Sequence, residues 1–223
     1  MDDKAKDGDT TSNLAAKQFV AALDEIDIAR RNEAFVSRLM SIVGPMDRAD
    51  LIDLGTGPAN VPLIVASVRP SWSITAVDSS PEMISVAQNR MTDNSGRIRL
   101  LCDDMLSPSI PDCSYDIVVA HFVLHHVKSA NQFWNQVSRI ARPGAFVLVR
   151  DVVRPNSRDD GFAVVRESSS LPSIIRESLF AAYLTAFTRD EIDRQLATAG
   201  LNGLTSAEVS PRIVDVFGQC HSG

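Results

Sequence analysis

The sequence predicts an α/β protein with a mostly parallel sheet, and three observations support this fold class. From about residue 51 to residue 151, short apolar runs typical of buried strands alternate with segments of helical periodicity. The first run, residues 51–54, is followed by a turn that contains Gly55 and Gly57. The second run ends in Asp78, roughly 20 residues after that turn. Because open α/β folds bind ligands at the carboxyl ends of their strands, we expect a ligand site beside this turn and this acid.

Composition is typical of an ordinary globular protein. The 223 residues suit one domain, or one domain with a small cap, and 44% hydrophobic residues are enough to build a full core. The formal net charge of −6 argues against binding through phosphate contacts, so no nucleic-acid partner is expected. No apolar run approaches the length that crosses a bilayer, so we expect no membrane partner.

Cysteine usage and the first residues both favour a cytoplasmic protein. Cys102, Cys113 and Cys220 are odd in number and have no paired spacing, so we expect reduced thiols and no metal site. Residues 1–9 are rich in charge and lack the apolar segment of a signal peptide.

The N-terminal part of the chain divides into a tail and a helical segment. Residues 1–13 are polar, and we expect a disordered tail there, followed by a single domain over residues 14–223. Apolar residues recur at three- and four-residue intervals up to residue 43, which predicts one or two helices within residues 14–45. Gly44-Pro45 ends this segment.

The first half of the sheet follows from local signals. Asn60 is expected to cap a helix over residues 61–67, with Pro62 in its first turn. Residues 73–78 form the second strand, and Ser80 with Pro81 begins the next helix. Residues 97–101 and 115–120 are predicted as the third and fourth strands.

The second half contains one more strand of this series, an insertion and a hairpin. Ser129 caps a helix, and a turn at Pro143-Gly144 leads into a fifth strand over residues 145–150. Residues 152–187 are predicted as a helical insertion that caps the ligand edge of the sheet. Thr188 and Glu191 form a capping box for a helix that stops at Gly200. Residues 203–209 and 212–217 form a hairpin that brings one antiparallel strand into the sheet.

Six segments in this order resemble the class I S-adenosylmethionine-dependent methyltransferases of the small-molecule type. They read LIDLGTGPANVP, ITAVDSSPEM, LLCDDM, YDIVVAHFVLHHV, RPGAFVLVRD and FTRDEIDRQLATAGL, and together they cover about residues 51–217. The chain departs from the family where a third glycine often stands near Ala59 and where a second glycine often precedes the fifth strand at Ala145. Alanine is small enough for both places.

The resemblance implies a Rossmann-like seven-stranded sheet with helices on both faces, and methyl transfer from S-adenosyl-L-methionine to a small-molecule acceptor, with S-adenosyl-L-homocysteine as the product. It implies that Asp78 accepts hydrogen bonds from both ribose hydroxyls and that Gly55 and Gly57 let the backbone lie against the cofactor. Asp103 is favoured over Asp104 as the acceptor from the adenine amine. The full expected cofactor set is Asp53, Gly55, Thr56, Gly57, Asp78, Ser79, Met83, Asp103, Asp104, Met105 and His121.

Three histidines follow the fourth strand. His121 lies where the sulfonium is expected and is the one candidate we assign to catalysis, as a general base. His125 and His126 are interpreted as residues that brace the loop. Phe122 stands where a zinc protease needs an acid, so the metal pattern is absent.

The acceptor pocket has no motif of its own, and we expect it to form between the N-terminal helices and the insertion. Asp151, Arg150 and Arg154 follow the fifth strand and are candidates to face it, as are Arg158, Arg166 and Arg176 for an anionic acceptor. A solvated helix face also explains these arginines, and it is the interpretation we favour.

Two other functions stay open at this point. A nicotinamide-dependent oxidoreductase would need a third glycine at Asn60, and the Cys102-Asp103-Asp104 segment also speaks against it. A non-catalytic protein that binds S-adenosylmethionine would keep the same cofactor residues. The sequence leaves a homodimer open.

Overall fold

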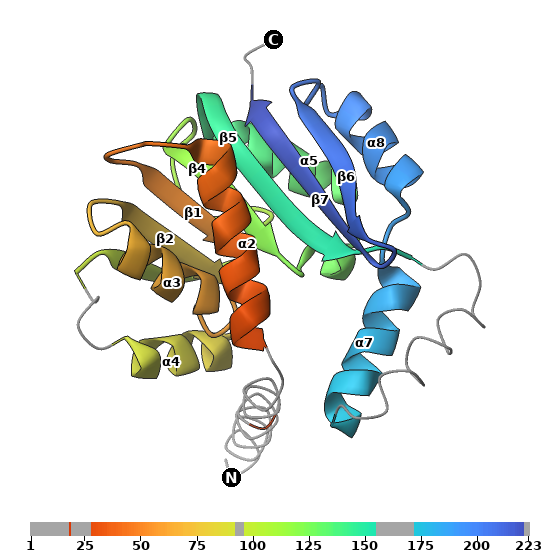
Figure 1. Ribbon diagram of the computed structural model, residues 1–223, viewed down its shortest axis with the longest axis horizontal. Coiled ribbons are helices and arrows are strands. Elements are labelled where there is room, and N and C mark those ends of the chain that lie inside the picture. The colour runs from red at the N-terminus through yellow and green to blue at the C-terminus, as the bar shows by residue number, and fades with distance from the viewer. Residues whose placement is uncertain (1–17, 19–27, 92–95, 155–171, 221–223) are drawn as a thin grey trace, which may run out of the picture.

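A seven-stranded sheet with helices on both faces forms the protein (Figure 1). The computed structural model describes residues 18, 28–91, 96–154 and 172–220. The strand order is β3-β2-β1-β4-β5-β7-β6, and β7 runs antiparallel to both of its neighbours, as predicted. The strands are β1 (Asp50–Leu54), β2 (Ser73–Asp78), β3 (Ile98–Cys102), β4 (Tyr115–His121), β5 (Ala141–Val152), β6 (Leu204–Ser210) and β7 (Ile213–Cys220).

Helices join and cover these strands. They are α2 (Ile28–Val43), α3 (Asn60–Val68), α4 (Pro81–Arg90), the 3₁₀ turn η1 (Leu124–His126), α5 (Ala130–Ile140), α7 (Ser173–Thr185) and α8 (Arg189–Thr198). In Figure 1, α2 crosses in front of the sheet, α5 lies behind it, and α7 lies beyond the end of β5. No helix among the described residues is long and apolar enough to cross a membrane.

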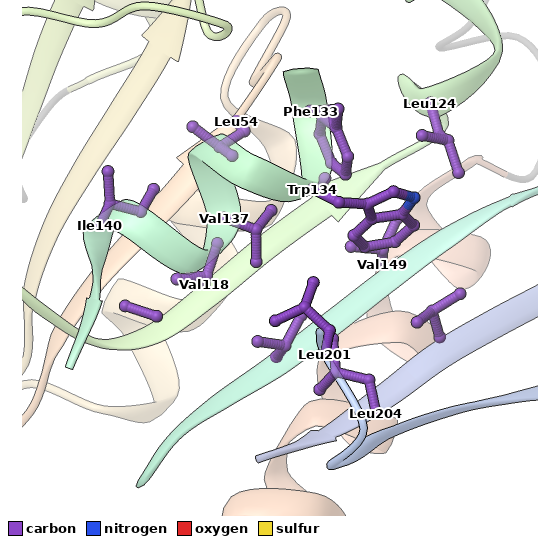
Figure 2. Close-up of a cluster of buried hydrophobic side chains, with 14 of the residues drawn as sticks. Leu54, Val118, Leu124, Phe133, Trp134, Val137, Ile140, Val149, Leu201 and Leu204 are labelled. Atoms are coloured by element: carbon purple, nitrogen blue, oxygen red, sulfur yellow. The ribbon is translucent and has the colours of Figure 1, made fainter. Parts of the chain in front are cut away.

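The sheet separates two apolar cores. On one face, Phe35 and Leu39 of α2 and Val65 of α3 pack against the apolar residues of β1, β2 and β4. On the other face, α5 and α8 bury a larger cluster, in which Trp134 is fully buried (Figure 2). Figure 2 labels Trp134 near Val149 of β5, with Leu201 and Leu204 below them in the view. The central strands β1 and β4 are buried on both sides, which explains their continuous apolar runs.

Most predicted helix ends are confirmed, and two local predictions are wrong. The side chains of Ser80 and Ser129 accept N–H groups in the first turns of α4 and α5. Asn60 does not cap α3: Ala59 takes that place in a left-handed conformation with φ 60°, while the Asn60 side chain accepts from Arg90. Pro143-Gly144 is not a turn before the fifth strand, because β5 already begins at Ala141 and continues through both residues.

Some predictions fall outside the described residues. These are the disordered tail at residues 1–13, most of the helical pattern at residues 14–27, and the part of the insertion at residues 155–171. The division of the chain into tail, single domain and cap therefore stays a prediction.

Candidate functional site

One cavity of about 670 Å³ lies where β1, β2 and β4 end. All of the expected cofactor residues except Asp103 line it. Since these residues are spread over some 70 positions of the sequence, the parallel sheet is what brings them together. The remaining walls come from α2, η1, α7 and the turn between β6 and β7. We call the part lined by Asp53, Asp78 and Asp104 the strand-end half, and the part lined by Arg31, Tyr183 and Arg212 the helix-lined half.

The glycine turn allows the chain to pass close to the loop after β4. Gly55 has φ 72°, and a Cβ atom placed on it would lie 2.3 Å from Cγ2 of Val123. The N–H groups of Gly55 and Thr56 both donate to the carbonyl of Val77, each at 2.9 Å. Phe122, next to Val123, has φ 57°, a conformation that costs free energy for a bulky residue and is typically stored at functional sites.

Asp78 at the end of β2 fixes the position of the glycine turn. Its two carboxylate oxygens accept the N–H of Gly57 at 2.7 Å and the N–H of Ser80 at 2.9 Å. A carboxylate oxygen has two lone pairs, so each oxygen keeps capacity for a further donor on the cavity side. The geometry therefore suits a ligand that presents two adjacent hydroxyl groups.

Asp53 is a buried acid with half of its carboxylate unsatisfied. It is 2% exposed, and the hydroxyl of Thr56 donates to one of its oxygens at 2.7 Å. The other oxygen is buried without a hydrogen-bond partner among the described residues. Burial raises the pKa of Asp53 to about 7, and the charge of Asp78 acts in the same direction. A cationic ligand at this point would restore the ionised form.

The two acids after β3 differ in their surroundings. Both oxygens of Asp103 accept backbone N–H groups, from Asp104 at 2.9 Å and Ser109 at 2.7 Å. These bonds hold the pKa of Asp103 below its usual range. Asp104, with Met105, lines the cavity, while Asp103 does not. The acid that the sequence analysis favoured therefore braces the loop, and its neighbour is the one on the cavity wall.

His121 lines the cavity but is poorly placed to exchange a proton. Its ring stacks on Phe35 with centroids 4.4 Å apart, and its Nε2 atom is buried without a hydrogen-bond partner in the described part of the chain. Burial, together with the positive charges of Arg150 and Arg31, lowers the pKa of His121 to about 3. The imidazole is therefore neutral and weakly basic.

His125 and Asp151 form a buried pair that the sequence analysis did not predict. Nδ1 of His125 lies 2.7 Å from Oδ1 of Asp151, and the side chains are 8% and 3% exposed. His125 lines the cavity, as does the more exposed His126. The two members are 26 residues apart, and they meet because β4 and β5 are parallel neighbours and η1, which follows β4, contacts β5.

The helix-lined half contains two arginines that sequence reasoning missed. Arg31 of α2 and Arg212 of the β6–β7 turn line the cavity together with Tyr183 of α7. The amphipathic pattern of the first helical segment was visible, but a periodicity does not reveal which of its polar residues faces a site.

Three of the arginines that were suggested to face the acceptor pocket lie in the described part of the chain. Arg150 pairs with Asp215, and Arg154 pairs with Glu191. Arg176 does not line the cavity. Arg158 and Arg166 lie outside the described residues.

Known proteins are similar to this chain in sequence and in fold. The family model described as a methyltransferase domain matches residues 52–149. The tRNA N(3)-cytidine methyltransferase METTL2 of Bos taurus is 28% identical over 160 residues, 68% of this chain and 41% of that protein. The ubiquinone/menaquinone biosynthesis C-methyltransferase UbiE of Geotalea daltonii is 29% identical over 111 residues, 47% of this chain and 46% of that protein. The chain spans less than half the length of both relatives.

Solved structures with this fold include a complex with the demethylated cofactor. The plantazolicin methyltransferase BpumL in complex with S-adenosylhomocysteine superposes with a TM-score of 0.72 at 14% identity, over 95% of this chain and 96% of that chain. Such a likeness concerns the fold. These findings confirm the predicted fold class, and the family match agrees with the predicted enzyme class and cofactor. A small-molecule acceptor stays a prediction, because METTL2 is a tRNA methyltransferase. Residues 52–149 therefore match a methyltransferase domain, and they lie on a Rossmann-like seven-stranded sheet.

Proposed function

We propose that the protein transfers a methyl group from S-adenosylmethionine to a small molecule held in the helix-lined half of the cavity. The observation that supports this most directly is the continuity of one cavity from the strand ends to α2 and α7. Its volume of about 670 Å³ lies within the range of roughly 300–1,000 Å³ that is usual for small-molecule sites. A cofactor and a small acceptor can therefore share it.

The strand-end half has features that fit the cofactor. Asp78 is proposed to accept the two ribose hydroxyls with its remaining lone pairs. Asp53, buried with one unpaired oxygen, is proposed to meet the ammonium group of the methionine part. Gly55 leaves no Cβ in the narrow space beside Val123, so the backbone can approach the ligand.

The adenine end is assigned to residues after β3 and at the start of α4. Asp104, on the cavity wall, is proposed to face the exocyclic amine, and Asp103 to hold the loop that carries Asp104. Met83, Met105 and Ser79 line the cavity beside this point and supply a largely apolar surface for the ring.

The acceptor is proposed to be a small molecule because helices enclose its half of the cavity. Ile175, Leu179 and Tyr183 of α7 lie over the end of β5, which suits the predicted substrate cap. The net charge of −6 also disfavours a long polyanion. When bound, the cofactor supplies an electrophilic methyl group on a sulfonium, and the task of the protein is to align the acceptor with it.

Calorimetric titration with S-adenosylmethionine, S-adenosylhomocysteine and NAD tests the cofactor assignment. We expect the first two to bind and NAD not to bind. Asp78→Ala removes a charged acceptor, and a hydrogen bond to a charged group is worth about 1.5–3 kcal/mol. The Kd of the variant is therefore expected to rise roughly 10- to 100-fold. Asp112→Ala, at an exposed acid that does not line the cavity, serves as the matched control and should bind as wild type.

The outcomes separate the remaining alternatives. Binding of NAD in place of the two sulfur compounds would overturn the assignment. Equal affinity in Asp78→Ala and wild type would remove Asp78 from the site. Methyl transfer from labelled cofactor to bulk tRNA, with none to small molecules, would replace the small-molecule acceptor with a nucleic acid.

A further inference from the structure

The pair formed by His125 and Asp151 has the geometry of an oriented proton acceptor. The Asp151 carboxylate accepts the backbone N–H of His125 at 3.1 Å and the backbone N–H of Val152 at 2.6 Å, and its Oδ1 lies 2.7 Å from Nδ1 of His125. Because the carboxylate is surrounded by donors, it can only accept from the ring. The proton of the neutral imidazole is therefore on Nδ1, and the lone pair is on Nε2.

Nε2 of His125 is available to a ligand. No hydrogen bond joins it to any group in the described part of the chain. Unlike Nε2 of His121, it is not among the polar atoms that are buried without a partner. Since His125 lines the cavity while Nδ1 is occupied by Asp151, the free nitrogen is the one that a substrate can reach.

The position of the pair matches the acceptor half. His125 belongs to η1, which packs against α7, and α7 provides the cavity residues Ile175, Leu179 and Tyr183. Val152, directly after Asp151, lines the same cavity and packs with Tyr183. The free nitrogen therefore borders the space that the proposed acceptor occupies.

We propose that His125, positioned by Asp151, is the general base of the reaction and that the acceptor is a small molecule methylated on a hydroxyl oxygen. This inference rests on the proposed function. An amine can attack with its neutral lone pair and lose a proton afterwards, and a thiol is partly ionised near neutral pH. A hydroxyl oxygen gains most from losing its proton during the attack, so a dedicated base favours this class of acceptor.

In the proposed step, one proton moves to His125 and one electron pair moves from the acceptor oxygen to the methyl carbon. The acceptor's O–H proton moves to Nε2 of His125, while an oxygen electron pair forms the new bond to the methyl carbon. The electron pair of the carbon–sulfur bond remains on sulfur, which becomes a neutral thioether. The imidazolium is stabilised by the Asp151 carboxylate and later releases the proton to solvent. Asp151 is thus a positioning residue, and His125 is the catalytic one.

Nitrogen NMR of the histidine side chains tests the proton position without an acceptor. The sequence has four histidines, so single His→Asn variants assign each signal in the full-length protein with bound S-adenosylhomocysteine. Neutral His125 is expected to show the Nδ1–H tautomer, and Asp151→Asn is expected to change the tautomer mixture. A neutral His125 protonated on Nε2 would overturn the proposal, whatever the acceptor.

Transfer of labelled methyl groups to matched probes tests the acceptor class. The probes are 4-hydroxybenzoate, its methyl ester, 4-hydroxyphenethyl alcohol and the amino analogue of each. Hydroxyl probes are expected to react in preference to amines, and His125→Asn is expected to lower kcat about 10²- to 10⁴-fold with unchanged affinity for S-adenosylmethionine. Transfer to the amines alone, transfer to none of the probes, or unchanged kcat in His125→Asn would count against the proposal. Loss of cofactor binding in wild type would instead refute the proposed function.

A pH profile separates catalysis from a structural role. Other titratable or charged groups that face the cavity are Arg31, Asp53, Asp78, Asp104, His121, His126, Tyr183 and Arg212. Because these groups remain in all variants, we compare the profiles of wild type, His125→Asn and Asp151→Asn. Wild-type kcat should rise with pH, and this rise should be absent in His125→Asn. If His125 were only structural, the variant would lose stability but keep the rise.

Discussion

At the residue scale, the cavity contains two groups with opposite effects on the pH dependence of folding. Asp53 keeps its proton to about pH 7 in the folded protein, against a usual pKa of 3.8. His121 takes up a proton only when the pH falls to about 3, against a usual pKa of 6.5. Burial is the main cause in both cases, since it disfavours the charged form of either group.

Between about pH 4 and pH 6.5, the folded and unfolded states bind different numbers of protons at Asp53 and at His121, so the stability of the protein depends on pH. For Asp53 the folded state binds more protons than the unfolded state, so its contribution to stability falls as pH rises. For His121 the unfolded state binds more protons, so its contribution rises with pH. The two slopes oppose each other in the protein without cofactor.

Replacing Asp53 or His121 alone should therefore remove the contribution of that residue to the pH dependence of stability. Relative to wild type, Asp53→Asn is expected to gain stability with rising pH, by up to about 1.4 kcal/mol per pH unit between pH 4.5 and 6.5. His121→Phe, which keeps an aromatic ring beside Phe35, is expected to lose stability relative to wild type as the pH rises over the same range. Urea unfolding at pH 4.5, 5.5 and 6.5 measures both. If the free energy of unfolding changed with pH in the same way for wild type, Asp53→Asn and His121→Phe, the prediction would be contradicted.

At the element scale, the beginning of α8 is stabilised by a reciprocal capping box. The Thr188 hydroxyl accepts the N–H of Glu191 at 3.3 Å, and a Glu191 carboxylate oxygen accepts the N–H of Thr188 at 2.9 Å. The Glu191 carboxylate also pairs with Arg154, which follows β5. The box therefore sets both the start of the helix and its position against the sheet.

Removal of the cap should cost measurable stability. Thr188→Ala is expected to lower the free energy of unfolding by about 0.5–2 kcal/mol, because the N–H of Glu191 loses its acceptor. Thr198→Ala, at the exposed end of the same helix, changes the same side chain without removing a cap and should cost less than about 0.5 kcal/mol. Both values come from urea midpoints at constant m-value. Equal losses in the two variants would show that the box is unimportant.

At the scale of the whole molecule, a buried ion pair joins strands that are distant in sequence. Arg150 of β5 and Asp215 of β7 stand directly opposite in the sheet, with Nε–Oδ1 at 2.6 Å and a second bond at 2.8 Å. Their relative exposures are 8% and 1%. The pair also reaches α2, because the Arg150 guanidinium lies 5.5 Å from the Phe35 ring and Arg38 lies 3.8 Å from Asp215.

A double-mutant cycle measures what this pair contributes. Asp215→Leu leaves the buried Arg150 without its carboxylate, and Arg150→Leu leaves the buried Asp215 with only Arg38 at 3.8 Å, so each is expected to cost about 3–5 kcal/mol. The double variant replaces both charges with apolar side chains and is expected to cost clearly less than the sum. Additive losses would mean that the two charges are independent.

Most of the fold was predicted from sequence signals that involve only neighbouring residues. The strand ends, the capping residues Ser80, Ser129 and Thr188, and the order of the elements all depend on neighbours within a few residues. The two errors have local reasons as well. Alanine was not expected in a left-handed conformation at position 59, and the apolar pattern does not show that β5 continues through Pro143-Gly144.

The sequence by itself determined the fold class and the strand-end half of the cavity, because parallel strands bring their carboxyl ends to one edge wherever the helices pack. Only the tertiary structure decided the helix-lined half. The pairing of His125 with Asp151 depends on how the backbone turns at Phe122, and the presence of Arg31 depends on the rotation of α2 about its axis. Periodicity gives a buried face, whereas these contacts depend on side-chain directions between residues far apart in the chain.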